Sequence, residues 1–464
     1  MRLAAWHGSM VRVKMPAVPL PEVGDVLELT VGEVAAGGWC VARRDAAGPV
    51  IFVRHALPGE RVRAVVTQTT SRLARADAVE IAAAAADRVP PPCPQARPGG
   101  CGGCDWQHAS LPAQRALKSE VIRQQLRRIA GLDRDVTVEP LAADGDHDGL
   151  GWRTRVRFAV RPDGLAGLRR HRSTEVVDVG ACPIAHPAVN EAKVPQRRWP
   201  GARSVQVAVA PGTGQRAVIV AGPPGRWDPG VPSGADSLLA VGRGGRISPL
   251  RGRGYLTERA AGRDWRVGAT TFWQVHPAAA QTLAAAVLGA LRPRPGELAL
   301  DLYCGAGLFA GVLAEAVGPR GGVIAIEDSA AAVRDARHNL RGTPWARVHR
   351  GDVAVLLRRD GLSGASLAVL DPPRTGAARP VIDQLCGPTG GKPDGAGAGA
   401  GLRRIAYVSC DPATLARDIA VFRGSGWQLA ALRAFDAFPM THHVECLATL
   451  VPGSAAPVTP ARLA

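Results

Sequence analysis

The distribution of apolar and polar residues changes along the chain and predicts a different structure in each third. Over residues 20–83 the two classes alternate in short runs, such as 26–31, 49–53 and 61–66, which glycine and proline separate. Alternation with a period of two residues predicts β-strands with one buried face. Several such strands in so short a stretch indicate a small β-barrel.

The middle of the chain, residues 84–265, mixes helical and strand patterns. It opens with the proline-rich run 90–94, which marks a boundary. A helix-like segment follows at 114–129 and a strand-like segment at 152–160, whereas the glycine- and proline-rich stretch 211–254 predicts loops between weak strands. We therefore expect a central α+β domain.

Within residues 266–452 the pattern of apolar and polar residues changes near residue 298. From there strand-like and helix-like segments alternate, which is typical of a parallel α/β sheet. The low-complexity run 387–402 predicts a flexible insertion, and residues 1–19 and 453–464 are expected to be tails.

Composition supports a folded protein that does not enter membranes. The 464 residues are 46% hydrophobic, which is ordinary for globular domains. No apolar run approaches the roughly 18 residues that span a bilayer, and no signal peptide is visible at the N-terminus. We expect a cytoplasmic location, where the nine cysteines favour metal ligation or catalysis over disulfides.

The excess of positive charge indicates a polyanionic partner. The net charge is +17, and residues 83–265 hold 27 basic residues against 17 acidic ones. Arg153, Arg155 and Arg157 occupy every second position of a predicted strand and so share one face, which suits RNA phosphates. A solvated strand face and an arginine-rich genome are the alternatives.

Four cysteines have a spacing typical of a metal site. Cys93, Cys101 and Cys104 lie in a proline- and glycine-rich loop, and Cys182 follows far downstream. Glycines before and between them let backbone N–H groups turn toward sulfur, as iron–sulfur clusters require. Structural zinc usually takes two C-x-x-C pairs, and only one occurs here. These residues alone leave cluster and zinc both open.

The segment 298–309 predicts a site for a nucleotide-bearing ligand. An apolar strand runs into Gly305-x-Gly307 and a helix, and Glu327 ends the next strand, where an acid suits a ribose diol. The full G-x-G-x-x-G and a phosphate-binding lysine are missing, which favours S-adenosylmethionine (SAM) over NAD. Asp352, after the third strand, is either an adenine contact or a helix cap.

Three further residues are candidates for catalysis or binding, and two of them come at strand ends, where ligands bind in α/β sheets. Asp371 ends the fourth strand in D-P-P, and Arg374 follows, where amino-methyltransferases carry an aromatic residue. Cys410 lies at the tip of the fifth strand, which favours a nucleophile over a core thiol. Glu445 lies on an apolar strand, where an unpaired carboxylate is costly; a salt-bridged structural role is the alternative.

Five motifs resemble those of the RNA uracil-C5 (m5U) methyltransferases over residues 20–452. They are the TRAM-like "GDVLELTVGEVAAGGWCVARR", the cysteine loop "CPQARPGGCGGCDWQH" with the later "CPIAHP", "FWQVH", S-C-D-P and H-x-V-E. The resemblance implies an N-terminal OB-like TRAM barrel (20–83), a central RNA-binding domain with a [4Fe-4S] loop (84–265) and a class I, Rossmann-like SAM-dependent methyltransferase domain (266–452).

It also implies the roles of individual residues. Cys410 corresponds to the nucleophile that adds to C6 of uracil, and Glu445 to the base that removes the C5 proton. Phe272 is a candidate to line the pocket of the flipped base. His276 and Leu308 stand where many members carry asparagine. The remaining assignments are SAM contacts by Gln274, Tyr303, Glu327, Asp352 and Asp371, and cluster ligation by Cys93, Cys101, Cys104 and Cys182.

The combination of TRAM barrel and cluster resembles the enzymes of 23S rRNA, so we expect a monomeric enzyme that methylates a uridine there. A tRNA target is the alternative, because some cluster-bearing members act on tRNA. A rival from another class is a non-catalytic RNA-binding iron–sulfur protein, against which the joint presence of Cys410, Glu445 and the SAM residues speaks.

Overall fold

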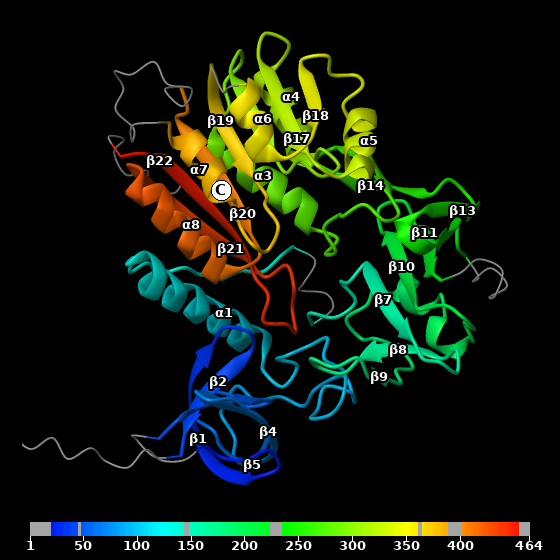
Figure 1. Cartoon of the computed structure of the whole chain (residues 1–464), viewed down its shortest axis with the longest axis vertical. Helices are drawn as coiled ribbons and strands as arrows, with labels where there is room; N and C mark the ends of the chain where they lie inside the picture. The colour runs from blue at the N-terminus through cyan, green and yellow to red at the C-terminus, as the bar shows by residue number, and fades with distance from the viewer. Residues whose placement is uncertain are drawn as a thin grey trace, which may run out of the picture. The chain divides into compact units, whose positions relative to one another are not determined.

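The computed structural model describes residues 20–44, 48–142, 148–222, 234–360, 364–387 and 401–453. The chain divides after Arg88 into two compact units, which are described separately (Figure 1). Most of the expected insertion and both tails lie outside the described residues. Within them, no helix has the length and apolar character needed to cross a bilayer.

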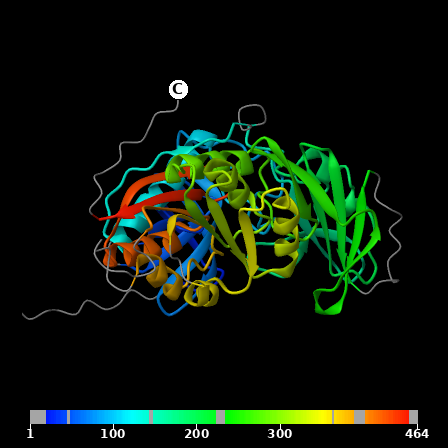
Figure 2. The same ribbon diagram turned by 90° about the horizontal axis from the view of Figure 1, so that it is seen from above.

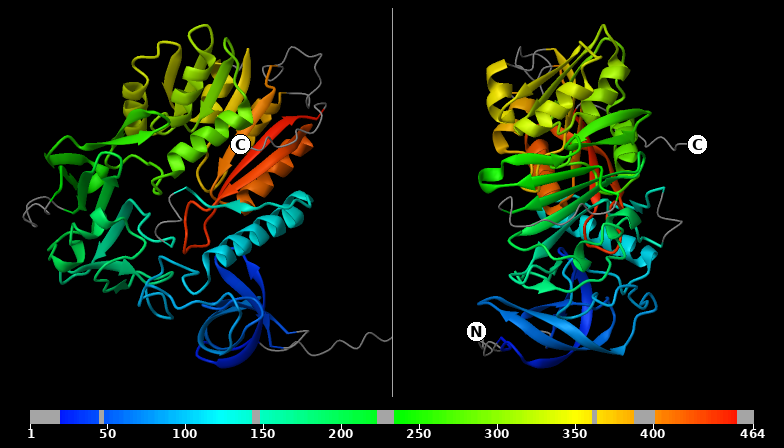
Figure 3. Two further views of the ribbon diagram at one scale, coloured as in Figure 1. Left: turned by 180° about the vertical axis from the view of Figure 1, so that it is seen from behind. Right: turned by 90° about the vertical axis from the view of Figure 1, so that its right-hand side faces the viewer.

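The first unit holds the predicted barrel, which is closed in the strand order β1-β2-β3-β5-β4 (Figure 3). Alternate residues of β1 and β4 are buried, as the sequence pattern predicts. At the end of the barrel the fully buried Glu60 carboxylate accepts from Arg88 Nε at 2.5 Å and from the Leu57 and Ala85 amides. The strands are β1 (Val26–Ala35), β2 (Trp39–Arg43), β3 (Val50–Arg54), β4 (Arg61–Thr69) and β5 (Leu73–Ala83).

The second unit is built on an eight-stranded sheet in the order β18-β17-β16-β19-β20-β22-β21-β6. β16 to β20 are parallel, and β22 is antiparallel to β20. Because β16 lies between β17 and β19, the chain reverses its direction of winding there, and such switch points open a crevice at the carboxyl ends of the strands. The strands are β16 (Leu298–Leu302), β17 (Gly322–Glu327), β18 (Ala346–Arg350), β19 (Ala365–Leu370), β20 (Arg404–Ser409), β21 (Trp427–Phe435), β22 (Glu445–Pro452) and β6 (Val138–Glu139).

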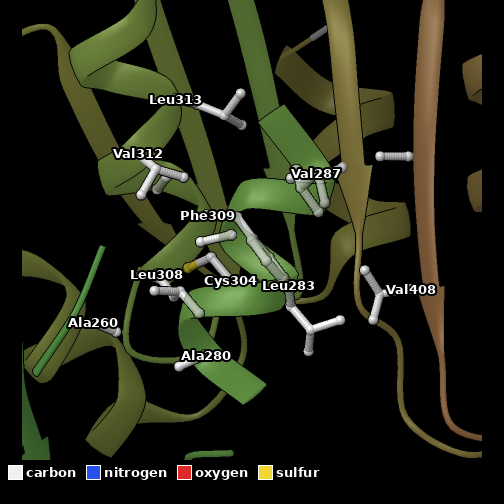
Figure 4. Close-up of a cluster of buried hydrophobic side chains, with 14 of the residues drawn as sticks. Ala260, Ala280, Leu283, Val287, Cys304, Leu308, Phe309, Val312, Leu313 and Val408 are labelled. Atoms are coloured by element: carbon white, nitrogen blue, oxygen red, sulfur yellow. The ribbon is translucent and has the colours of Figure 1, made fainter. Parts of the chain in front are cut away.

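Helices bury both faces of this sheet, as parallel strands require. One face packs on α3, α4 and α5, where Leu283, Phe309 and Leu313 form a core with Val408 of β20 (Figure 4). The other face packs on α1 and α6 to α8. The helices are α1 (Leu111–Gln125), α3 (Ala279–Leu291), α4 (Leu308–Val317), α5 (Ala330–Asn339), α6 (Val353–Asp360), α7 (Arg379–Cys386) and α8 (Pro412–Gly424).

A second sheet, in the order β13-β12-β11-β10-β7-β8-β9, lies to one side of these layers (Figure 2). It includes β11 (Gln215–Ala221), β12 (Ser237–Val241) and β13 (Ile247–Arg251), so the described part of 211–254 forms more regular structure than the loops we expected. The other strands are β7 (Arg155–Val160), β8 (Ala166–Arg169), β9 (Val176–Val177) and β10 (Ser204–Ala210).

Residue 265 is not a boundary between compact units, because 89–464 form one unit. The hairpin of β14 (Tyr255–Ala260) and β15 (Arg263–Gly268) puts Trp265 into the core beside Phe309. In the other direction, β6 joins the eight-stranded sheet beside β21, and α1 lies alongside α8 (Figure 1). Sequence patterns show which face of an element is apolar, but not which sheet that face will cover.

Candidate active site

A cavity of about 980 Å³ opens at the carboxyl edge of the eight-stranded sheet. Because consecutive parallel strands end at one edge, residues far apart in sequence meet there. β22 runs the opposite way, so Glu445 at its start reaches the same edge. The cavity is lined by every predicted SAM and catalytic residue, together with Phe272: Gln274, Tyr303, Glu327, Asp352, Asp371, Cys410 and Glu445.

The turn after β16 lines this cavity and holds the Glu327 carboxylate beside it. Glu327 Oε2 accepts from the amide of Gly305 at 3.0 Å, while its Oε1 accepts from the amide of Ser329 at 2.7 Å. These bonds fix the carboxylate at the end of β17. Tyr303 has φ of 66°, a left-handed conformation that is strained for a non-glycine residue and is typical of ligand sites.

The segment that carries Phe272 and Gln274 is fastened to the helix after β17. Thr271 Oγ1 donates to Asp335 Oδ2 of α5 at 2.7 Å. Gln274 is buried, whereas Phe272 remains 68% exposed although it lines the cavity. An aromatic ring held at a cavity mouth offers a stacking surface for a base.

The electrostatics of the catalytic end depend on two buried carboxyl groups. Burial raises the pKa of Asp371 to about 7. The pKa of Glu445 is raised well above its usual value by burial and by Asp371. Burial raises the pKa of Cys410 to about 11, with Glu445 adding to the rise and the Arg374 guanidinium opposing it. Asp371 and Glu445 thus hold their protons to a higher pH than free carboxyl groups do, and Arg374 favours the thiolate form of Cys410.

Arg374 and His443 also line the cavity, and sequence reasoning gave neither a positive role. Arg374 Nη2 lies 3.4 Å from His443 Nε2, and the His443 ring packs on His442 with centroids 4.1 Å apart. His442 Nδ1 in turn lies 2.6 Å from Asp105 Oδ2, beside the cysteine loop. In the sequence, the pair His442-His443 shortly before Glu445 is the signal that could have pointed to His443.

The four predicted metal ligands lie together around a second cavity of about 710 Å³. All four thiols are free, and the amide of Gly103 points to Cys101 Sγ at 3.4 Å, as the glycine pattern predicts. Gly102 is packed so closely on the backbone of His171 that a Cβ would lie 2.5 Å from its Cα. Within the described residues, no three His, Cys, Asp or Glu side chains are placed to hold one metal ion.

The three arginines of the predicted phosphate-binding face have different surroundings. Arg157 is exposed, and Arg153 lines both cavities. The Arg155 guanidinium is instead buried, donates to the Thr271 carbonyl and lies 4.0 Å from Glu258. The two-residue period cannot show that the 255–271 segment covers this end of the strand. The Arg155 guanidinium does not face solvent, so this residue is less accessible to RNA than Arg153 and Arg157.

Three protein-family models match this chain, one in the first unit and two in the second. The TRAM domain model matches residues 21–79, and the tRNA (Uracil-5-)-methyltransferase model matches 368–451. The protein-L-isoaspartate(D-aspartate) O-methyltransferase model matches 269–384, which includes the SAM-type strands β16 to β19.

Two curated relatives cover almost the whole chain, and both are named as RNA methyltransferases. The protein from Streptomyces avermitilis is 50% identical over 447 residues, with 93% of this chain and 99% of the relative covered. The protein from Streptomyces coelicolor is 49% identical, with 94% and 95% covered.

A solved structure has the same fold. It is the tRNA (uracil-54, C5)-methyltransferase of Pyrococcus abyssi in complex with S-adenosyl-L-homocysteine, with a TM-score of 0.69 and 22% identity. The match covers 92% of this chain and 100% of that one.

Proposed function

This chain belongs to the uracil-C5 family of RNA methyltransferases, and from that premise we propose that it methylates C5 of one uridine in 23S rRNA. The observation that carries the proposal is the convergence of Cys410 and Glu445 with five SAM-type residues around one cavity. A purely RNA-binding protein has no need of a thiol and a buried carboxyl group at the end of a SAM site.

In the proposed reaction, Cys410 makes C5 of uracil more nucleophilic, because C5 is too weak a nucleophile to attack a methyl group unaided. The thiolate forms a bond to C6, and the resulting enolate attacks the methyl group of SAM through C5. The S–CH3 bond breaks to leave S-adenosylhomocysteine. Glu445 then takes the C5 proton, and the electrons of that C–H bond expel Cys410 from C6.

Surrounding side chains prepare these steps. Arg374 opposes the rise in the pKa of Cys410 and so increases the thiolate fraction. Burial and Asp371 raise the pKa of Glu445, which makes its carboxylate a stronger base once it is ionised. We assign Glu327 to the ribose hydroxyls of SAM and Phe272 to stacking on the flipped uracil, because both line the cavity.

For the second cavity we propose a [4Fe-4S] cluster held by Cys93, Cys101, Cys104 and Cys182. Thiols spread around a cavity suit a multi-iron group better than one zinc ion, at which all ligands converge. The bound cluster would cross-link the cysteine loop to residue 182. The loop itself supports the catalytic end, since the amides of Asp105 and Trp106 donate to the Met440 carbonyl, shortly before Glu445.

The choice of 23S rRNA rests on the joint presence of barrel and cysteine loop, and we propose a cytoplasmic monomer. A tRNA substrate is the second candidate, because the matching family model and the Pyrococcus abyssi neighbour are both named for tRNA. Mass spectrometry of rRNA and tRNA nucleosides from a deletion strain decides between them by which RNA loses 5-methyluridine.

Two substitutions test the mechanism. Cys410→Ala should abolish both methylation and the denaturation-resistant RNA adduct. Glu445→Gln should still permit addition and methyl transfer but slow release by about 10²–10⁴-fold, so that methylated RNA accumulates on the enzyme. A 5-fluorouridine substrate should trap the wild type in the same way.

Matched controls are Cys386→Ala on α7 and Glu315→Gln on α4, which lie outside the cavity and should turn over normally. An adduct formed by Cys410→Ala would assign the nucleophile to another group. Full turnover by Glu445→Gln would remove Glu445 from the role of base.

A further inference from the structure

The cysteine loop borders the cavity of the predicted nucleophile. Gly102 and Gly103 line both the cavity of Cys410, called the catalytic cavity from here on, and the cavity of the four cysteines, the cysteine cavity. The two cavities therefore adjoin. Asp105 follows in the same loop and is buried.

The carboxyl group of Asp105 contacts the segment just before β22. Its Oδ2 accepts from the backbone amide of His442 at 3.2 Å and lies 2.6 Å from His442 Nδ1. A carboxylate oxygen only accepts hydrogen bonds, so Nδ1 carries the proton of the second bond. Together the two bonds fix both the backbone and the ring of His442.

The neighbouring ring of His443 is held between two other rings. It packs on His442 with centroids 4.1 Å apart, and the Phe438 ring meets it at 75° with 6.0 Å between centroids. Burial, with smaller contributions from His442 and Arg374, lowers the pKa of His443 to about 3. His443 is therefore neutral and has one bare nitrogen, which accepts a hydrogen bond.

Arg374 supplies the donor for that nitrogen. Its Nη2 lies 3.4 Å from His443 Nε2, and a guanidinium group only donates, so Nε2 is the bare nitrogen. The same guanidinium is within hydrogen-bonding reach of the Cys410 thiol. Burial raises the pKa of Cys410, and the charge and the hydrogen bond of Arg374 oppose that rise. The backbone of Arg374 is held separately, since its carbonyl accepts from Thr414 Oγ1 at 3.0 Å.

The contacts of Asp105 and its charge have opposite effects on the thiol. An arginine side chain has many rotamers, so a guanidinium stays beside one atom only where neighbours hold it. Holding Arg374 in place favours the thiolate of Cys410. The negative charge of Asp105, acting across space, disfavours it. The direction in which Cys410 responds to the loss of Asp105 therefore separates the two effects.

We propose that Asp105 is a positioning residue of the proposed reaction, on which this inference rests. Through the two histidine rings it holds the guanidinium of Arg374 beside the Cys410 thiol. The cysteine loop thereby increases the reactivity of a nucleophile that lies far away in the sequence.

The test measures how fast Cys410 reacts with iodoacetamide near pH 8 in the full-length protein, without RNA or SAM. Mass spectrometry of the peptide that contains Cys410 separates its reaction from that of the other thiols. Below its pKa, a thiol reacts about tenfold more slowly for each unit by which that pKa rises. Asp105→Ala should lower the rate about threefold, and Asp105→Asn, which retains an acceptor oxygen, should restore most of it. The control Asp383→Ala, an exposed acid of α7 outside the catalytic cavity, should react like the wild type.

The Arg374→Gln background shows whether the effect passes through the guanidinium. Arg374→Gln alone should lower the rate at least about threefold, and adding Asp105→Ala should change nothing further, because residues that act through one group are not additive. His442→Ala makes the same comparison without altering the cysteine loop. The carboxyl groups that face Cys410, those of Glu445 and Asp371, are the same in every variant.

A wild-type or faster rate in both Asp105→Ala and His442→Ala overturns the proposal. A loss that persists in full in the Arg374→Gln background also overturns it. Iron and acid-labile sulfide are determined for every sample, and if Asp105→Ala loses iron or fails to fold, His442→Ala decides alone. Methyl transfer to 23S rRNA and tRNA transcripts by the wild type is scored separately. No methylation of either would refute the proposed function and leave the alkylation result standing, since alkylation needs neither substrate.

Discussion

The two adjoining cavities of the second unit differ in the sign of their charge. The catalytic cavity is lined by five acidic residues and two arginines, the cysteine cavity by six arginines and no acid. SAM carries a sulfonium and an ammonium group against one carboxylate, so its net charge is positive, whereas RNA is a polyanion. The difference indicates how one protein can bind both a cationic cofactor and a polyanion: the acidic and the basic side chains line separate cavities, and Arg153 lies at the border between them.

The largest expected effect comes from neutralising an acid in the SAM cavity. Glu327→Gln removes the charged acceptor that we propose for two ribose hydroxyls, and it loosens the bond to the Gly305 amide. Charged hydrogen bonds contribute about 1.5–3 kcal/mol each, so we expect SAM affinity to fall about 100-fold in titration calorimetry. RNA affinity should not change. Asp383→Asn, an exposed acid on α7, is the control, and an equal loss there would refute a specific contact.

Salt should affect RNA affinity and SAM affinity very differently. Raising monovalent salt from about 50 to 200 mM should weaken RNA binding about 2.6-fold for each phosphate contact to a single strand, while SAM binding changes less than about twofold in all. Filter binding and calorimetry on one preparation measure the pair. Parallel salt dependence of both ligands would show that the fields are not separate.

The third contrast is the response to pH. Arginine stays charged, so RNA affinity should be constant between pH 6 and 9. Turnover should rise about tenfold per pH unit over pH 7–9, because the pKa of Cys410 is raised to about 11 and the thiolate fraction grows with pH. The rise should be steeper at lower pH, where Glu445, with its raised pKa, also holds a proton. A flat turnover profile at saturating RNA would count against the thiolate step.

The smallest effect concerns stability. Burial raises the pKa of Asp371 to about 7, so the folded state binds its proton more tightly than the unfolded chain. That contribution is complete below about pH 4 and is lost as the pH rises through 7. Asp371→Asn should therefore raise Tm by about 2 °C at pH 8 and by less than half as much at pH 5, as scanning calorimetry can measure. Equal shifts at both pH values would show that the buried charge is not the cause.

The sequence predicted the parts of the site that depend on local order. Cys410, Glu327 and Asp371 each follow or end an apolar strand, and the common edge of a parallel sheet brings them together. What it could not show is how distant segments cover one another. Arg155 is hidden by Glu258 and Thr271, more than 100 residues away.

The same limit applies to the fold. The barrel and the alternating strands from residue 298 follow from local periodicity. The strand β6 has only two residues, too few for a periodic pattern to be recognised. Its partner β21 lies about 300 residues further along the chain, and local sequence does not indicate so distant a pairing.

The pairing of β6 with β21, and of Lys118 with Asp436, has a consequence for the order of events during synthesis. Both Lys118 and Asp436 are fully buried, with Nζ and Oδ1 2.5 Å apart. At about 5–20 residues per second the ribosome releases α1 roughly 15–60 s before its partners. Until then α1 and the turn Leu126–Ala130 after it must remain undocked, with Ile122 and Leu126 uncovered. A nascent chain that stops before Asp436 therefore presents the apolar face of this helix to chaperones and proteases, and the sheet closes only as the last segments emerge.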